Sequence, residues 1–163
     1  MSETTYLRQL ASAIVYNLQH QHEWAQLSIH THSPLTGLPF PRPLVSGLPP
    51  KKIYTHPDEQ AEILRTERKI SNHIIQHPER EWVLPTRLEE KWSLHKFADI
   101  FDAIPVIPPE DEIGQRREFE PIQVEQQWKG RQRQKRVLLA TLHDDSTVVY
   151  YIIHDGIVKP RQN

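Results

Sequence analysis

Histidine is the residue type with the widest chemical range in this chain, and ten histidines occur among its 163 residues. Four of them form two His-x-His pairs, His20 with His22 and His30 with His32. On a helix, two-residue spacing sends side chains to different faces, which disfavours chelation by the first pair. The second pair would share one face of a strand, but no carboxylate lies at a ligand spacing familiar from metal sites. The sequence therefore predicts no metal site and no cofactor.

Signatures of common hydrolases are missing from the sequence. It contains no Gly-x-Ser-x-Gly, no His-Glu-x-x-His and no glycine-rich loop that could hold a phosphate. It also contains no cysteine, which excludes disulfides, cysteine nucleophiles and cysteine zinc sites. The residues by themselves therefore indicate no recognised catalytic arrangement.

A basic stretch near the C-terminal end is the one candidate for contact with nucleic acid. It follows Trp128 and its five cationic residues are Lys129, Arg131, Arg133, Lys135 and Arg136. Such side chains could position RNA through its phosphates without reading its sequence. The alternative is a solvated charge run, which could also act as a nuclear-import signal.

Two apolar runs, Val137–Leu142 and Val148–Ile153, flank an acidic tip that contains Asp144 and Asp145, and this pattern predicts a β-hairpin. Asp is common in such turns, which alone accounts for the acidic tip. The second run has no polar position, so both of its faces should be covered. A second chain could supply that cover, which makes a protein interface the first functional hypothesis. Its residues would be Val148, Val149, Tyr150, Tyr151, Ile152 and Ile153.

Length and composition favour one domain with sizeable loops. The chain has 163 residues, 37% hydrophobic residues and 14 prolines, which cluster in 34–50 and 105–121. The formal net charge of −1 gives no general attraction to nucleic acid or membrane. No signal-peptide pattern and no membrane-spanning apolar run is present, so we expect a soluble intracellular protein.

Local patterns predict a mixed arrangement of helices and a mostly antiparallel sheet, an α/β or α+β fold. Apolar spacing and caps favour helices over 4–26, 56–78 and 93–104. Strands are expected at 81–84 and in the hairpin, with a short edge strand at 43–45, another at 51–54 and loop elsewhere in 33–50. Residues 105–135 are expected to form a flexible insertion within a single domain that covers 1–163.

Four segments carry a resemblance to one known family. The terminal segment 143–156, with Pro160 after it, resembles the C-terminal end of the smallest, non-catalytic subunit (subunit fifteen) of the eukaryotic tRNA-splicing endonuclease. Residues 82–85, leading to the 93–104 helix, are similar to its middle unit, and 14–16 with Trp24 to its first helix. Residues 46–60 resemble the fungal branch of the family.

This resemblance implies a restriction-endonuclease-like α/β domain in a heterotetramer of two catalytic and two structural subunits that cleaves precursor tRNA. It implies that the C-terminal strand pairs edge to edge with a catalytic partner, subunit thirty-four. In related archaeal enzymes an acidic loop enters a basic groove, which makes Asp144 and Asp145 the candidates here. The family works in the nucleus or, in other lineages, on the cytosolic face of mitochondria; we expect the nucleus.

The catalytic members of that family cleave RNA with a Tyr, a His and a Lys, leaving 2′,3′-cyclic phosphate and 5′-hydroxyl ends. Here His56 precedes a proline, His95 falls within a predicted helix, and His143 has no nearby glycine. The resemblance therefore implies a structural subunit that is not itself an enzyme. Two alternatives remain open: a homodimeric RNA endonuclease of the same fold, and a small RNA-binding adaptor that uses residues 129–136. The isolated chain could also form a homodimer through its apolar edge.

Overall fold

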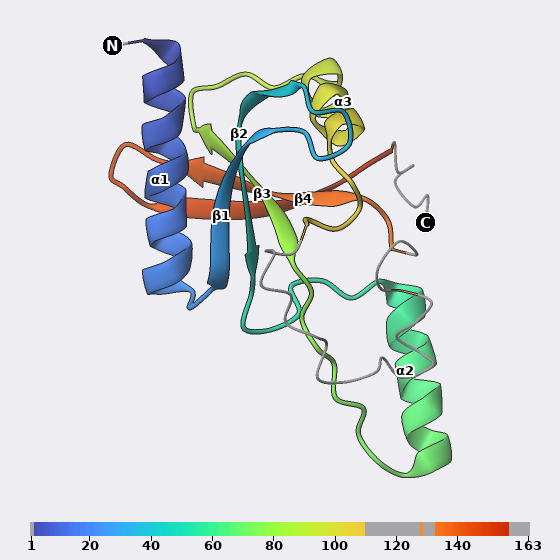
Figure 1. Cartoon of the computed structure of the whole chain (residues 1–163). Helices are drawn as coiled ribbons and strands as arrows, with labels where there is room; N and C mark the ends of the chain where they lie inside the picture. The colour runs from blue at the N-terminus through green and yellow to red at the C-terminus, as the bar shows by residue number, and fades with distance from the viewer. Residues whose placement is uncertain (1, 110–127, 129–132, 157–163) are drawn as a thin grey trace.

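A five-stranded mixed sheet with helices on both faces forms the body of the molecule (Figure 1). The structure is a computed structural model, and it describes residues 2–109, 128 and 133–156. The expected α+β class is confirmed. In chain order the elements are α1 (Glu3–Gln21), β1 (Ala25–His32), β2 (Pro39–Leu48), α2 (Pro57–Ile70), β3 (Glu81–Arg87), α3 (Leu94–Ala103), β4 (Arg136–Leu142) and β5 (Val148–His154).

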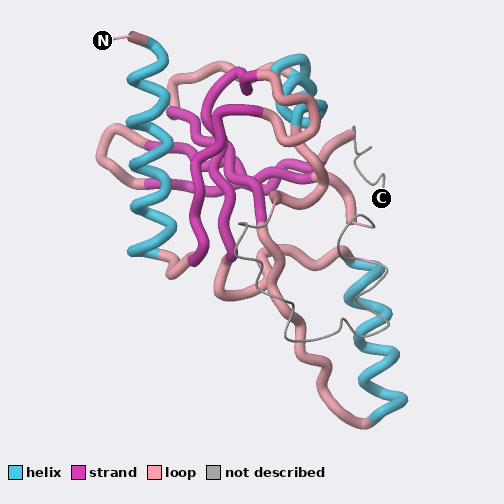
Figure 2. The backbone as a smooth tube through the Cα atoms, in the orientation of Figure 1, coloured by secondary structure: helices cyan, strands magenta, loops and turns pink. Residues whose placement is uncertain are grey.

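The order of the strands across the sheet is the same as their order along the chain. Figure 2 shows the strands in magenta, with helices in cyan around them. Three of the four strand pairs are antiparallel and one, β3 with β4, is parallel. A parallel pair needs a crossover connection, and α3 lies on that connection. This topology leaves β1 and β5 at the two edges of the sheet.

Two apolar clusters lie on opposite faces of the sheet, because neighbouring residues of one strand contribute to different clusters. Val83 and Leu138 belong to the cluster under α1, together with Ile14 and Leu18. Trp82 and Val137 belong to the cluster under α3. The apolar stripe predicted for the first helix is therefore confirmed, although α1 ends at Gln21 and not at residue 26.

The first two strands differ most from expectation. Residues 25–32 form β1, which was not predicted, and residues 39–48 form a ten-residue inner strand and not a short edge strand at 43–45. The prolines of β2 are tolerated because β2 pairs with β3 only through Val45, Ser46 and Gly47. Residues 51–54 are not a strand.

Helix α2 extends away from the sheet (Figure 1). It begins after His56, whose side chain accepts a hydrogen bond from the Asp58 amide. It ends at Ile70, and not near residue 78 as expected, because the cap residue Ser71 adopts a left-handed conformation. Its buried side chains are Glu59 and Ile63, whereas Leu64, expected on the buried face, is 48% exposed. Among the described residues, no helix combines the length and apolar character needed to cross a bilayer.

The predicted strand at 81–84, the helix from 93 and the C-terminal hairpin are all present. Ser93 caps α3 by accepting a hydrogen bond from the Lys96 amide at 3.2 Å. Of the expected insertion at 105–135, residues 110–127 and 129–132 lie outside the described part of the chain.

Candidate functional site

The strand β5 forms one edge of the sheet and pairs, within the described residues, with β4 alone. All seven residues of β5 pair in one register, from Val148 opposite Leu142 to His154 opposite Arg136, with no bulge. None of the seven is fully buried, and none carries a permanent charge. This edge is therefore regular, largely apolar and open.

The hydrogen-bonding groups that point outward can be assigned from the two ends of the ladder. The His143 amide donates to Thr147 O at 2.8 Å, and the Asp155 amide donates to Lys135 O at 2.8 Å. In an antiparallel ladder hydrogen-bonded pairs alternate with non-bonded pairs, so odd-numbered residues of β5 bond to β4. The main-chain groups of the even-numbered residues therefore face the open edge: Val148, Tyr150, Ile152 and His154.

Side chains of β5 are divided between the two faces of the sheet. Val148, Tyr150 and Ile152 pack against the cluster under α1, and Ile153 packs against the cluster under α3. On the same face as Ile153, Tyr151 is 53% exposed. A strand added beside β5 would therefore meet apolar side chains on both of its faces.

The other edge of the sheet is irregular. The β1–β2 register shifts twice, between Ala25 and Ser28 and again between His30 and His32. Gln26 has a φ of 52°, a left-handed conformation that interrupts regular pairing. Bulges of this kind protect sheet edges against further pairing. Of the two edges, β5 is the one suited to accept another strand.

The acidic tip of the hairpin uses its two aspartates differently. The side chain of Asp145 accepts a hydrogen bond from the Thr147 amide at 3.0 Å, and hydrogen bonds from Thr147 lower the pKa of this carboxyl. Ser146 completes the turn with a φ of 69°. Asp144 is exposed and makes no hydrogen bond or ion pair within the described residues. Asp144 therefore presents the freer charge.

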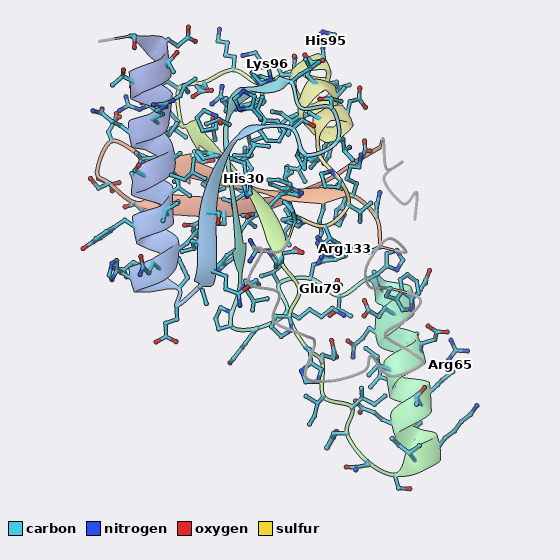
Figure 3. The ribbon with its side chains drawn as sticks, viewed as in Figure 1. His30, Arg65, Glu79, His95, Lys96 and Arg133 are labelled. Atoms are coloured by element: carbon cyan, nitrogen blue, oxygen red, sulfur yellow. The ribbon has the colours of Figure 1, made fainter. Side chains whose placement is uncertain are left out.

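Two residues of the basic stretch are buried in an ion cluster at the start of β3. Arg136 donates bidentately to Glu81, from Nη2 to Oε1 at 2.7 Å and from Nε to Oε2 at 3.1 Å. Arg133 Nη1 lies 2.7 Å from Glu81 Oε1 and 3.8 Å from Glu79 Oε1, and Figure 3 labels Arg133 and Glu79. Arg133 is 6% exposed and Arg136 is 9% exposed. Burial lowers the pKa of Arg133, against the effect of Glu81. These two guanidinium groups are buried, and their ion pairs with Glu81 connect the start of β4 to the start of β3.

The other members of that stretch are less constrained. The Lys135 ammonium donates to Phe101 O at 2.9 Å, which ties it to the end of α3. Lys129 and Arg131 lie outside the described residues. The ion cluster was not predicted from the sequence, because its acidic members lie more than fifty residues before its arginines.

Two aromatic rings, those of Tyr54 and His154, are in contact at the C-terminal end of β5. The His154 ring packs on Tyr54, with 4.6 Å between ring centroids, and its Nδ1 is buried without a hydrogen-bond partner within the described residues. Burial, then the nearby charge of Arg136 and of His56, lower the pKa of His154. This imidazole is therefore held in its neutral form beside the open edge.

The other histidines are dispersed. His30 Nε2 lies 2.7 Å from Ser46 Oγ in the β1–β2 pair, while His20 and His22 lie at the end of α1. No group of three or more potential ligand residues is close enough to hold a metal ion in the described part of the chain. Of the histidines weighed for catalysis, His56 caps α2 and His95 lies in the first turn of α3, at the opposite end of the molecule (Figure 1).

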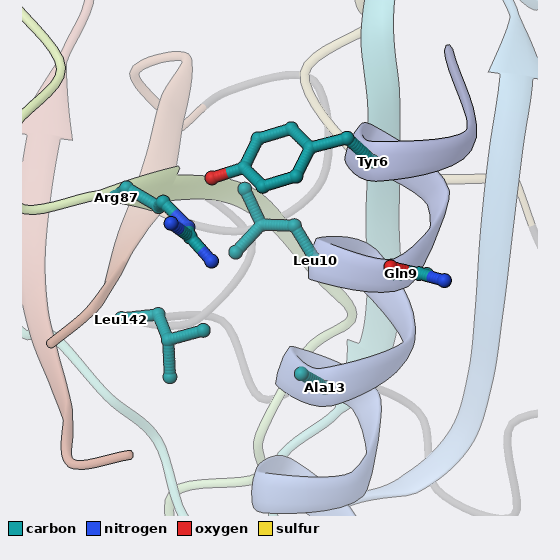
Figure 4. A pocket seen from close by; sticks show the side chains of 6 residues that line it. All are labelled: Tyr6, Gln9, Leu10, Ala13, Arg87 and Leu142. Atoms are coloured by element: carbon teal, nitrogen blue, oxygen red, sulfur yellow. The ribbon is translucent and has the colours of Figure 1, made fainter. Parts of the chain in front are cut away.

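A small open pocket lies between α1 and the ends of β3 and β4 (Figure 4). The guanidinium of Arg87 lies over the ring of Tyr6, 4.6 Å from its centroid. The volume is about 120 Å³, well below that of a typical ligand pocket. Its lining residues are Tyr6, Gln9, Leu10, Ala13, Arg87 and Leu142.

Comparison with known proteins gives two consistent matches. The family model described as Sen15 protein matches residues 13–163. A protein of Neurospora crassa named "Probable tRNA-splicing endonuclease subunit tsp-1" is 49% identical over 163 residues. That alignment covers all of this chain and 70% of the relative.

Proposed function

This chain belongs to the Sen15 protein family, and on that basis we propose that it is a non-catalytic, structural subunit of a tRNA-splicing endonuclease. The name of the Neurospora relative supports the complex, and the open edge of β5 supports the structural role. Within a heterotetramer of two catalytic and two structural subunits, the chain would hold a catalytic subunit in place for cleavage of precursor tRNA.

The observation that carries this proposal is that the edge formed by β5 is regular and open, whereas the opposite edge, formed by β1, is bulged. We propose that a strand of the catalytic subunit, subunit thirty-four, pairs with the outward main-chain groups of β5. Main-chain hydrogen bonds would then fix the register, and apolar side chains on both faces would provide affinity. The same open edge would allow the isolated chain to form homodimers.

The acidic tip extends the proposal to a second contact in the heterotetramer. We propose that it enters a basic groove on another subunit, with Asp144 as the principal contact. Asp145 would support it by holding the turn, since its carboxylate already accepts the Thr147 amide. We further propose a restriction-endonuclease-like fold and a nuclear location, with the cytosolic face of mitochondria as the alternative.

The non-catalytic role is supported by where the candidate histidines lie. His56 has its Nδ1 engaged in capping α2, and His95 lies on α3 with its side chain 87% exposed. His143 lies at the hairpin turn. A cleavage site needs a base, an acid and a cation around one phosphate. Release of 2′,3′-cyclic phosphate ends from precursor tRNA by the pure chain alone would contradict this part of the proposal.

The edge contact is tested by charge substitution. Tyr151→Asp places a carboxylate on an exposed position of β5, where a partner strand would have to bury it at a large desolvation cost. We expect the co-expressed catalytic subunit to be lost from affinity co-purification while the variant chain itself stays folded; Val149→Asp should act in the same way. The matched control is Leu94→Asp, because Leu94 is 76% exposed on α3. Unchanged co-purification of Tyr151→Asp would rule out the edge contact.

A pair of proline substitutions tests the direction of the main-chain groups. The Ile152 amide faces the open edge, so Ile152→Pro should leave the hairpin folded and weaken partner binding. The Ile153 amide bonds to β4, so Ile153→Pro should instead disrupt the hairpin of the isolated chain. Circular dichroism of each chain and co-purification with the partner separate the two effects. Equal loss of folding in both variants would contradict the assigned register.

A further inference from the structure

The C-terminal half of helix α2 carries an exposed face whose ionic residues are all basic. Positions 61, 64, 65 and 68 recur at helical spacing and form one side of the helix with Lys69. Each of these residues is exposed, and Leu64 is 48% exposed. Figure 3 shows Arg65 on the side of α2 away from the sheet. We call this the outer face of α2; its residues are Ala61, Leu64, Arg65, Arg68 and Lys69.

Three of the four acidic residues of the same helix have partners among the described residues. Glu59 is buried and forms an ion pair with Lys52. Glu62 accepts a hydrogen bond from Trp128 Nε1 at 2.7 Å. Glu67 lies 3.4 Å from His73 Nδ1 and accepts the Ile74 amide at 3.3 Å.

The fourth acidic residue, Asp58, lies in the first turn of α2. At 1.5 Å per residue, it is about 10 Å along the helix axis from Arg65. The Asp58 side chain is exposed and, seven residues before Arg65, lies on the same side of the helix, so this side is acidic at its start and basic over its C-terminal half.

The three cations of the outer face make no ion pair within the described residues. Arg65 donates only to Ala61 O, one turn earlier in the same helix, at 3.5 Å. Lys69 and Arg68 lie in the last turn, where positive charge complements the helix dipole. That local effect accounts for two of the three positions and leaves Arg65 unexplained.

The position of α2 leaves its outer face accessible when a partner covers β5. The helix starts near the C-terminal end of β5, where Tyr54 contacts His154, and then extends away from the sheet (Figure 1). Arg65, Arg68 and Lys69 occupy the half of the helix farther from that contact. The open edge and the outer face can therefore bind different partners at the same time.

We propose that the outer face of α2 binds the phosphate backbone of the precursor RNA. This inference rests on the proposed function, which brings that RNA to the complex. Guanidinium and ammonium groups without an ion-pair partner are suited to bind phosphates. Arg65 and Arg68 can each bind one phosphate bidentately. RNA contact was first expected from the basic stretch at 129–136, but Arg133 and Arg136 are buried against Glu81. We therefore assign part of this contact to α2.

The test measures the salt dependence of RNA binding. The chain is purified in complex with its catalytic partner, and binding to an intron-containing precursor tRNA transcript is measured over a range of salt concentrations. The triple variant Arg65→Gln, Arg68→Gln, Lys69→Gln keeps good helix formers at all three positions. The slope of log K against log salt is negative, and each lost phosphate contact reduces its magnitude by roughly 0.7 to 0.9. We therefore expect the magnitude of the slope to decrease by about 2 to 3 in the triple variant. Binding at low salt should weaken accordingly.

Two controls make the result specific. The triple variant Arg8→Gln, Lys51→Gln, Lys91→Gln removes three exposed cations from other parts of the surface and should leave the slope nearly unchanged. The double variant Arg65→Lys, Arg68→Lys keeps the charge and should keep most of the slope. Circular dichroism checks that the helical content of the glutamine variant equals that of the wild type.

The remaining outcomes overturn the inference. An unchanged slope in an intact variant complex would exclude RNA contact by α2 and leave the proposed function standing. Loss of a subunit from the variant complex, with the slope unchanged, would make the outer face a protein contact. Failure of the proposed function would appear separately, as a wild-type chain that recovers no catalytic subunit. The slope comparison on the isolated chain would then still decide the role of α2.

Discussion

The hydroxyl of Tyr150 donates a hydrogen bond to Asn17 Oδ1 at 2.6 Å, and this bond joins the edge strand β5 to helix α1 across 133 residues of sequence. Burial raises the pKa of Tyr150 well above the ordinary tyrosine value. The ring also contacts His22 edge-on at 5.2 Å between centroids. The open strand is thus fixed from the α1 side while its outer main-chain groups stay free.

Removal of that hydroxyl should destabilise the chain modestly. Tyr150→Phe deletes the donor to Asn17, and we expect a loss of about 1 kcal/mol in the free energy of unfolding, measured by urea denaturation. Tyr151→Phe is the matched control, because Tyr151 is exposed and its hydroxyl forms no bond within the described residues. A cost in Tyr151→Phe equal to that in Tyr150→Phe would contradict the assigned bond.

The raised pKa of Tyr150 gives this effect a pH dependence. The folded state favours the neutral phenol, so the stability it contributes is complete below the unfolded pKa of about 10 and is lost as pH rises above it. Between pH 8 and about 11 the wild type should lose more stability than Tyr150→Phe. Parallel pH profiles for the two proteins would show that the phenol is not buried as described.

The pKa of His154 is lowered, which predicts the opposite dependence at acid pH. Its folded-state pKa lies below the unfolded value of about 6.5, so the contribution is complete above that pH and is lost as pH falls through the folded pKa. We expect His154→Gln to reduce the acid sensitivity of unfolding. The control is His73→Gln, because the His73 side chain is 97% exposed. An NMR titration placing the pKa of His154 above 6.5 would contradict this prediction.

Glu81 is expected to be among the most sensitive positions in the chain. Glu81→Gln would leave Arg133 and Arg136 buried without their carboxylate, and breaking a buried pair in this way costs about 3 to 5 kcal/mol. Glu67→Gln removes a carboxylate whose partner His73 is exposed, and should cost less than about 1 kcal/mol. Chemical denaturation of both variants measures the difference. Similar stabilities would show that the ion cluster contributes little.

Gly47 is required by close packing against β1. A Cβ at this position would lie 2.6 Å from Leu27 Cδ2 and 3.0 Å from Trp24 Cε3. Gly47→Ala should therefore destabilise the chain by about 1 to 3 kcal/mol in urea denaturation, because overpacking forces neighbours out of position. Shortening Leu27 to Ala should relieve part of that cost, so a double-mutant cycle should show coupling. Additive costs would exclude Leu27 as the source of the clash.

Elements with strong local signals were predictable from the sequence. The α1 stripe, the Ser93 cap and the hairpin each follow from spacing or turn chemistry within about twenty residues. Strand β1 was not predicted because apolar residues at helical spacing continue through Trp24, and β2 was not predicted as an inner strand because of its prolines. The prediction of which face of α2 is buried was wrong, because the charged residue Glu59 is buried in an ion pair with Lys52.

The candidate site shows the same division between local and distant causes. The apolar character of β5 was visible in the sequence, but its outward main-chain groups follow only from the ladder to β4. The arginines at 133 and 136 resembled a solvated charge run, because Glu79 and Glu81 come together with them only in the folded chain. Position in the sheet and long-range pairing therefore decide which residues can act at the surface.

Because the edge of β5 is open, the stability of this protein in the cell should depend on the amount of its proposed partner. A chain made in excess of that partner would present unpaired edges that can join to one another, and a partner made in excess would lack its support. Assembly would protect both chains from turnover, since each withdraws a surface that quality-control proteases and chaperones bind. The balance between the two rates of synthesis would then set the amount of functional complex in the cell.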